Sequence, residues 1–259
     1  MRAHAVLAAA VIAAALIYLF LQSQSSSAKK NLREACTSIA DNDLGVMCSA
    51  VFYREPLDCR RVYDDSSRDW CYRAVARVAK DSDICSRITD RGGIDQCYID
   101  LAIKNRDRDL CDRISEQNDI NWCYATLKGD GAYCRNIQDN EGQKAECLAI
   151  TAADTGACDG INDQWRKTDC YRELAITKKD TPACDKIDAD DERAWCKTLV
   201  AIIRTDHTIC LGIGEQEHKA RCIAVVNKDP AVCDEITDKA MRDNCLWNVV
   251  AAERDYYNT

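Results

Sequence analysis

The sequence predicts an all-α fold: a disulfide-stapled α-solenoid of about nine helical hairpins, preceded by an N-terminal hydrophobic helix. Three observations predict it. The 18 Cys recur in pairs at a fixed spacing, acidic and apolar residues recur at fixed offsets from them, and the chain holds only two Phe and three Pro. A constant period of about 20–50 residues is the signature of stacked repeats, in which each unit packs on its neighbours.

The first segment, residues 1–22, is expected to be a signal anchor or a signal peptide. Ala5 to Leu21 are seventeen consecutive apolar residues, and residues 23–31 form a Ser-rich tether. Seventeen helical residues span roughly 25 Å, at the short end for crossing a bilayer. Ser26 and Ala28 also fit a cleavage rule of small residues. We therefore expect an exported chain, held in the membrane by Ala5–Leu21 or secreted after cleavage near Ala28.

The repeat domain spans residues 32–255 and is followed by a short tail, residues 256–259. Within a cysteine pair the spacing is twelve in eight cases and thirteen for Cys134 and Cys147, and from one pair to the next it is eleven or fourteen. These spacings define nine units of 23 to 26 residues. The difference between eleven and fourteen is close to one helical turn, so we expect the longer helix of a unit to gain or lose one turn.

Each unit is predicted to be a short helix, a turn and a longer helix. Ile or Val always follows the first Cys by three residues, on the same helical face. An acidic residue usually precedes that Cys by four positions, where it is expected to cap the short helix by accepting hydrogen bonds from free N–H groups. These residues are Glu55, Asp81, Asp107, Asp130, Asp154, Asp180, Asp206 and Asp229, with Leu32 in the first unit.

The cysteines are expected to form structural disulfides within the hairpins. Zinc sites usually draw ligands from C-x2–4-C knuckles, and thioredoxin-like enzymes need C-x-x-C. No two cysteines here are closer than eleven residues. The spacing within a pair is almost invariant while the spacing between pairs varies, and disulfide geometry tolerates little variation. The predicted bridges are Cys36–Cys48, Cys59–Cys71, Cys85–Cys97, Cys111–Cys123, Cys134–Cys147, Cys158–Cys170, Cys184–Cys196, Cys210–Cys222 and Cys233–Cys245.

The charge and the motifs of the sequence limit the classes of function to be considered. A formal net charge of -8 argues against nucleic-acid binding, which needs Lys and Arg against the phosphates. No nucleophile, P-loop, dinucleotide or HExxH motif occurs, so we expect no catalytic residues, metal or cofactor. His207 and His218 are expected to be solvent-exposed and unrelated. The acidic turns at 64–69 and 188–192 lack the EF-hand pattern and are interpreted as solvated loops.

Trp70, Trp122 and Trp195 are the candidate binding residues. Each directly precedes the second Cys of its unit, while Tyr72, Tyr98, Tyr124 and Tyr171 directly follow it. Repeated aromatic residues at one position could line a face that binds a partner, because Trp and Tyr dominate interface hot spots. The alternative interpretation, which we favour, is that they cover the disulfides and fill contacts between repeats.

The pattern D-x-x-x-C-x-x-I … C-Y-x-x-x-A, as in "DSDICSRITDRGGIDQCYIDLA", resembles that of uncharacterised archaeal cysteine-pair helical repeat proteins. It covers nearly the whole chain after residue 31. The architecture is also similar to that of secreted Sel1-like cysteine-rich repeat proteins, in which disulfides join paired helices, although their repeats are longer and their cysteines closer together. The resemblance implies a helical repeat fold and no particular activity.

These observations favour a non-catalytic, extracytoplasmic scaffold, tethered to the membrane, that binds a protein or cell-surface partner. One alternative is a structural subunit that associates with itself into an extracellular filament or surface layer. Another is an enzyme whose site cannot be recognised from the sequence.

Overall fold

The computed structural model describes residues 32–257, so the predicted hydrophobic segment and Ser-rich tether lie outside the described residues. No helix in the described part is both long and apolar enough to span a membrane. Residues 32–257 are helical and contain no strand, as predicted. The long helices are α2 (Asn42–Tyr53), α3 (Asp65–Ala79), α4 (Arg91–Asn105), α5 (Gln117–Lys128), α7 (Glu141–Ala152), α9 (Gln164–Lys178), α10 (Asp190–Arg204), α12 (Gln216–Asn227) and α13 (Lys239–Glu253).

Each long helix is paired with a short helix of one or two turns. In the first unit, residues 32–38 form it. The others are η1 (Pro56–Arg61), η2 (Ser82–Arg87), η3 (Arg108–Arg113), α6 (Gly131–Cys134), α8 (Thr155–Asp159), η4 (Cys184–Lys186), α11 (Thr208–Leu211) and η5 (Pro230–Glu235). The η elements are 3₁₀ helices, a form that proteins use in short pieces.

The nine predicted disulfides are confirmed, each within one hairpin. Their Cα–Cα separations run from 5.4 to 5.9 Å, inside the range that a disulfide needs. No described cysteine is free, and all are buried. A disulfide that closes a loop of about a dozen residues contributes about 3 kcal/mol in the chain-entropy model. The bridge therefore fixes a hairpin that has little core of its own.

The alternation of eleven and fourteen residues is also explained as predicted. Where eleven residues separate one pair from the next, the long helix has 12 residues, as in α2, α5, α7 and α12. Where fourteen separate them, it has 15, as in α3, α4, α9 and α10. The added three residues extend the end of the helix, and the hairpin around the disulfide is unchanged.

The predicted acidic cap of the short helix is confirmed in seven units and wrong in one. Glu55, for example, accepts from the N–H of Leu57, and Asp81 accepts from the N–H of Asp83. The same bond, to the N–H two residues on, forms at Asp107, Asp130, Asp154, Asp206 and Asp229. Asp180 does not cap η4, because the residue two positions on is Pro182, which has no N–H.

Neighbouring units are joined by a repeated polar contact that the sequence analysis did not find. An acidic or amide side chain of one long helix accepts hydrogen bonds from backbone N–H groups about twenty residues further on, at the start of the next long helix. Asp95 Oδ1, for example, accepts from the N of Ser115 at 2.9 Å. The same contact is made by Asp43, Asp69, Asn118 and Glu217. The acceptor stands two or five residues before the second Cys, positions that share one helix face.

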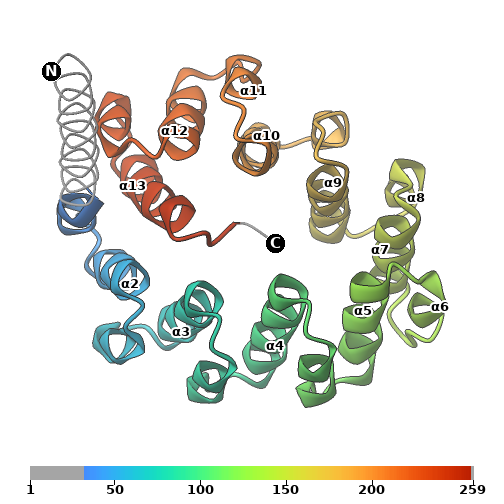
Figure 1. The fold of residues 1–259 in the computed structure, drawn as a ribbon. Helices are drawn as coiled ribbons and strands as arrows, with labels where there is room; N and C mark the ends of the chain where they lie inside the picture. The colour runs from blue at the N-terminus through green and yellow to red at the C-terminus, as the bar shows by residue number, and fades with distance from the viewer. Residues whose placement is uncertain (1–31, 258–259) are drawn as a thin grey trace, which may run out of the picture.

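The stack closes into a ring, because the last unit makes this contact with the first (Figure 1). Asp243 in α13 stands two residues before Cys245, and its Oδ2 accepts from the N of Ala40 at 3.1 Å and the N of Asp41 at 3.2 Å. α13 packs against α2 as α2 packs against α3. The long helices form the inner wall of the ring and the short helices lie outside.

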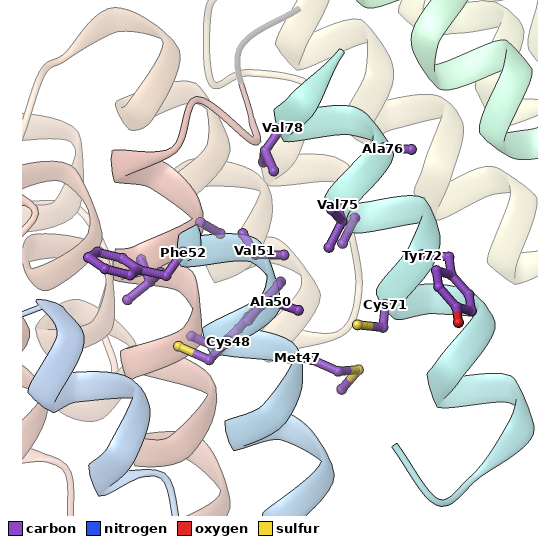
Figure 2. Packing of buried hydrophobic residues seen from close by; sticks show 14 of the residues in the cluster. Met47, Cys48, Ala50, Val51, Phe52, Cys71, Tyr72, Val75, Ala76 and Val78 are labelled. Atoms are coloured by element: carbon purple, nitrogen blue, oxygen red, sulfur yellow. The ribbon is translucent and has the colours of Figure 1, made fainter. Parts of the chain in front are cut away.

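The core lies between the long helices, where the buried residues of the described part form four clusters that together follow the ring. Figure 2 shows Val51 of α2 and Val75 of α3 on facing sides of the gap between these helices, and both are fully buried. Phe52 points the other way, toward α13. One hydrophobic cluster includes residues of α2, α3, α12 and α13, so the joint between the last and first units is packed like the interior joints. Stacking buries the apolar stripes, as expected.

Candidate binding site in the ring lumen

Two of the three candidate tryptophans line the lumen. Successive helical residues are turned by about 100°, so the residue before the second Cys turns toward the inner wall and the residue after it turns the other way. Trp70 and Trp195, on α3 and α10, border one common cavity. Two of the tyrosines that follow the second Cys bond back to their own hairpin instead: the hydroxyl of Tyr124 donates to Asp112 at 2.5 Å and that of Tyr171 donates to Asp159, and each acceptor directly follows the first Cys of its unit.

Trp122 does not belong to this cavity. It is partly buried against the hydrophobic cluster of the fourth and fifth units, which contains Cys134 and Ile137. The interpretation that the aromatic residues fill contacts between repeats therefore holds for Trp122. Trp70 also fills such a contact, against Trp247 of the ninth unit, but Trp70 and Trp195 both line one cavity, as the binding interpretation requires.

Three further aromatic residues complete the cluster, and the sequence analysis missed them. Trp247 lies two residues after Cys245, away from the repeated position, and Tyr256 and Tyr257 belong to the tail. The ring centroids of Trp70 and Trp247 are 4.9 Å apart, those of Trp195 and Tyr257 are 5.6 Å apart, and those of the two tyrosines 5.1 Å. Such tilted and edge-to-face arrangements are the favourable ones for aromatic rings.

The tail is held inside the lumen by residues of distant units. Asp255 has a positive φ of 57°, which turns the chain inward after α13 (Figure 1). The backbone O of Tyr256 accepts from Nε of Arg77 at 2.6 Å, and the backbone O of Asp255 accepts from Nζ of Lys104. The hydroxyl of Tyr257 donates to Oδ1 of Asn248 at 2.6 Å. Because Arg77 and Lys104 lie on α3 and α4, the tail reaches across the ring from α13.

The charged groups near the tail are mostly paired. Asp100 Oδ2 lies 3.1 Å from Nε of Arg73, and its Oδ1 lies 3.7 Å from Nη1 of Arg77. Glu192 Oε2 lies 2.6 Å from Nη2 of Arg172. Burial raises the pKa of the Tyr257 hydroxyl well above its ordinary value, so this tyrosine stays neutral.

Arg221 differs from the other lumen arginines. Its guanidinium carbon lies 5.2 Å from the ring centroid of Trp195, a cation–π distance. Among the contacts within residues 32–257, its buried Nε and Nη2 donate no hydrogen bond. Burial lowers the pKa of this guanidinium, and the carboxylates of Asp191 and Glu192 partly oppose the shift. The stacked arginine therefore places a positive charge beside the aromatic cluster.

The cavity between these side chains has a volume of about 430 Å³. Trp70, Trp195, Trp247, Tyr256 and Tyr257 supply its aromatic lining, and Asp191, Glu192, Arg221, Asn244 and Asn248 supply its polar groups. Asp191 and Asn244 are exposed at its edge. Aromatic and polar residues share this lining about equally, so the cavity offers both apolar surface and convergent polar groups, the two features that small-ligand sites combine.

Two expectations about other polar residues have different outcomes. His207 is exposed as expected, but His218 is buried, because the side of α12 that carries it packs toward a smaller hollow beside Arg193 and Lys197. The acidic turns are more than solvated loops: Asp64 caps α3, and Asp190 pairs with Arg193. Across residues 32–257 no group of three or more His, Cys, Asp or Glu is arranged to hold a metal ion.

No family model, curated protein or solved structure matches the chain.

Proposed function

We propose that the chain is a non-catalytic binding scaffold that works outside the cytoplasm, and that its binding site is the aromatic cavity at the lumen. The nine disulfides indicate an oxidising compartment, because thiols stay reduced in most cytosols. Tethering by Ala5–Leu21 and a protein or cell-surface partner remain part of this proposal.

The observation that carries the proposal is the convergence of aromatic residues from separate units on one cavity. Trp70, Trp195 and Trp247 lie in the second, seventh and ninth units, far apart in sequence. Each is fixed by a hairpin whose two helices are joined by a disulfide. A rigid, preorganised site loses less conformational entropy when it binds, so the stapled frame favours a binding role.

The two alternatives depend on different features. End-to-end polymerisation would need free faces on the first and last units, and in the ring these faces pack on each other. A hidden enzyme would rest on Glu173 in α9, whose carboxyl pKa is raised by burial despite the opposing charges of Arg172 and Arg77. A raised carboxyl pKa also occurs in purely structural surroundings, so the binding role is the better supported of the three.

The proposal is tested with the full chain, exported into an oxidising compartment, purified in mild detergent and immobilised. Envelope material from the source cells is passed over the wild type and over Trp195→Ala and Trp165→Ala variants. Trp165 is a matched control, because it is 75% exposed and lies outside the cavity. We expect the wild type and Trp165→Ala to retain the same component and Trp195→Ala to lose it. Equal retention by all three would contradict a lumen site.

Light scattering on the same full-chain preparation tests the filament alternative. A ring with closed ends is expected to keep one molar mass as protein concentration rises. A molar mass that grows with concentration, in the wild type and in Trp195→Ala alike, would favour self-association and contradict the scaffold proposal.

A further inference from the structure

We infer that the lumen cavity binds a neutral, ring-shaped polyhydroxylated ligand, that is, a sugar ring of a free saccharide or of a surface glycan. The inference rests on the proposed function and names the ligand class of the same cavity. It depends on three features: flat aromatic surfaces, charges of both signs at short range, and hydrogen-bonding groups at the edge.

The aromatic side chains provide flat walls. Trp70 and Trp195 are only half-buried and line the cavity, whereas Trp247 is 4% exposed and packs against Trp70 with the ring centroids 4.9 Å apart. A pyranose ring carries C–H groups on its faces and hydroxyl groups around its rim. Its faces can therefore pack on an indole while its rim reaches polar groups, a match to large amphipathic rings.

The charges at the cavity disfavour simple ions of either sign. A cation that enters the cavity meets the positive charge of the Arg221 guanidinium, whose carbon lies 5.2 Å from the ring centroid of Trp195. An anion attracted by Arg221 meets Asp191 and Glu192, which line the same cavity. Like charges brought together in a partly desolvated site repel strongly, whereas a neutral ligand avoids both penalties.

The polar groups at the edge suit hydroxyls. The carboxylate of Asp191 accepts hydrogen bonds, and the amide of Asn244 both donates and accepts them. Both side chains are exposed, and no ion pair forms at Asp191 within residues 32–257. The cavity volume of about 430 Å³ lies inside the range of about 300–1,000 Å³ that holds small ligands.

The full chain in mild detergent is titrated with a fixed panel, followed by tryptophan fluorescence and saturation-transfer NMR. The panel is the methyl glycosides of glucose, galactose, mannose and N-acetylglucosamine, the disaccharides maltose, cellobiose and chitobiose, and choline chloride and sodium acetate as ionic probes. We expect at least one neutral sugar to bind saturably, and neither ion to bind as tightly.

Variants locate the site. Trp195→Ala is expected to weaken sugar binding about tenfold or more, because it removes a stacking surface. Asp191→Asn, an exposed change that leaves the core intact, is expected to weaken it about threefold to tenfold. Trp165→Ala is expected to bind like the wild type. Tighter binding of choline or acetate, no saturable sugar, or an equal loss in Trp165→Ala would each overturn the inference.

The two proposals fail in different ways. If envelope material is retained through the lumen but neither binds panel sugars nor is displaced by them, the sugar inference fails and the scaffold function stands. If sugars bind directly while no lumen-dependent component is retained, the ligand class holds and the surface-scaffold function fails.

Discussion

Asp243 makes the polar contact that joins the last unit to the first, and replacing it with Ala should weaken this joint. In the wild type its Oδ2 accepts from the N–H groups of Ala40 and Asp41. A hydrogen bond to a charged group contributes about 1.5–3 kcal/mol. Two features reduce the loss. Ala40 and Asp41 are exposed, so water can replace the carboxylate, and the buried Oδ1 of Asp243 has no partner within residues 32–257.

The net effect of Asp243→Ala is therefore expected to be a loss of about 1–3 kcal/mol in the free energy of unfolding. It is measured by denaturant unfolding of the full chain with its disulfides intact. Asp95→Ala is the matched control, because Asp95 is 1% exposed and makes the same contact, to Ser115 and Glu116, at an interior joint. We expect the loss in Asp95→Ala to be the larger of the two, because Asp95 also accepts from the Ser115 hydroxyl and both of its carboxylate oxygens have partners.

Hydrogen exchange reports the joint directly. The amides of Ala40 and Asp41 are expected to be protected in the wild type and to exchange about tenfold faster or more in Asp243→Ala. Two results together would contradict this expectation. The first is a change of less than about 0.3 kcal/mol in the unfolding free energy of Asp243→Ala while Asp95→Ala destabilises the chain, and the second is free exchange of both amides in the wild type. The ring would then be open in solution, and the closure argument would be wrong.

Three further predictions concern stability. Thr205→Gly should stabilise the chain by about 1 kcal/mol in denaturant unfolding, because Thr205 is β-branched and holds a φ of 52° that Gly adopts without strain. Burial raises the pKa of Glu146 from 4.5 to about 7, although the charge of Arg166 opposes this shift. The folded state therefore keeps this proton up to a higher pH than the unfolded state does. The unfolding free energy of the wild type minus that of Glu146→Gln should therefore fall by up to about 3 kcal/mol as the pH rises from 4.5 to 7. A difference that does not change with pH would contradict this. Replacing Cys59 and Cys71 together with Ser should lower the unfolding free energy by about 3 kcal/mol, and a loss below 1 kcal/mol would show that stacking alone orders the hairpin.

The local structure could be predicted because it depends on short distances along the chain. The disulfide pairing followed from the invariant spacing within pairs, and the two lengths of long helix followed from the difference of three residues between pairs. The error at Asp180 was also local. The cap was predicted from the acidic residue alone, although Pro182 lacks the N–H group that the cap requires.

The contacts between units could not be predicted in the same way. The acceptor stands two residues before the second Cys at Asp69 and five before it at Asp43, so no single aligned column shows it. Trp247 and Tyr257 lie outside the repeated aromatic position, and only the turn at Asp255 brings the tail to the lumen. Their role depends on closure of the ring, and closure results from the small rotation between neighbouring units, added over all the units.

One sequence feature does bear on closure, namely the character of the terminal units. Open solenoids need terminal repeats with polar outer faces. Here the first unit has Leu32 where the other units have an acidic cap, and Leu32 is 3% exposed. In the last unit Val250 is fully buried. Leu32 and Val250 belong to the one hydrophobic cluster that includes both α2 and α13, so the packing of the last unit on the first buries apolar surface of the terminal units.

Closure also determines the binding site. Leu44 of the first unit and Asn244 and Trp247 of the last line the same cavity as Trp70 and Trp195. An open stack would separate Leu44 from Trp247 and divide the cavity. Ligand binding and closure are therefore thermodynamically linked: a ligand that binds only the closed ring stabilises the joint, and weakening the joint lowers the apparent affinity by the fraction of rings that open. Asp243, which lies outside the cavity lined by Trp70 and Trp195, should thus affect binding only through closure.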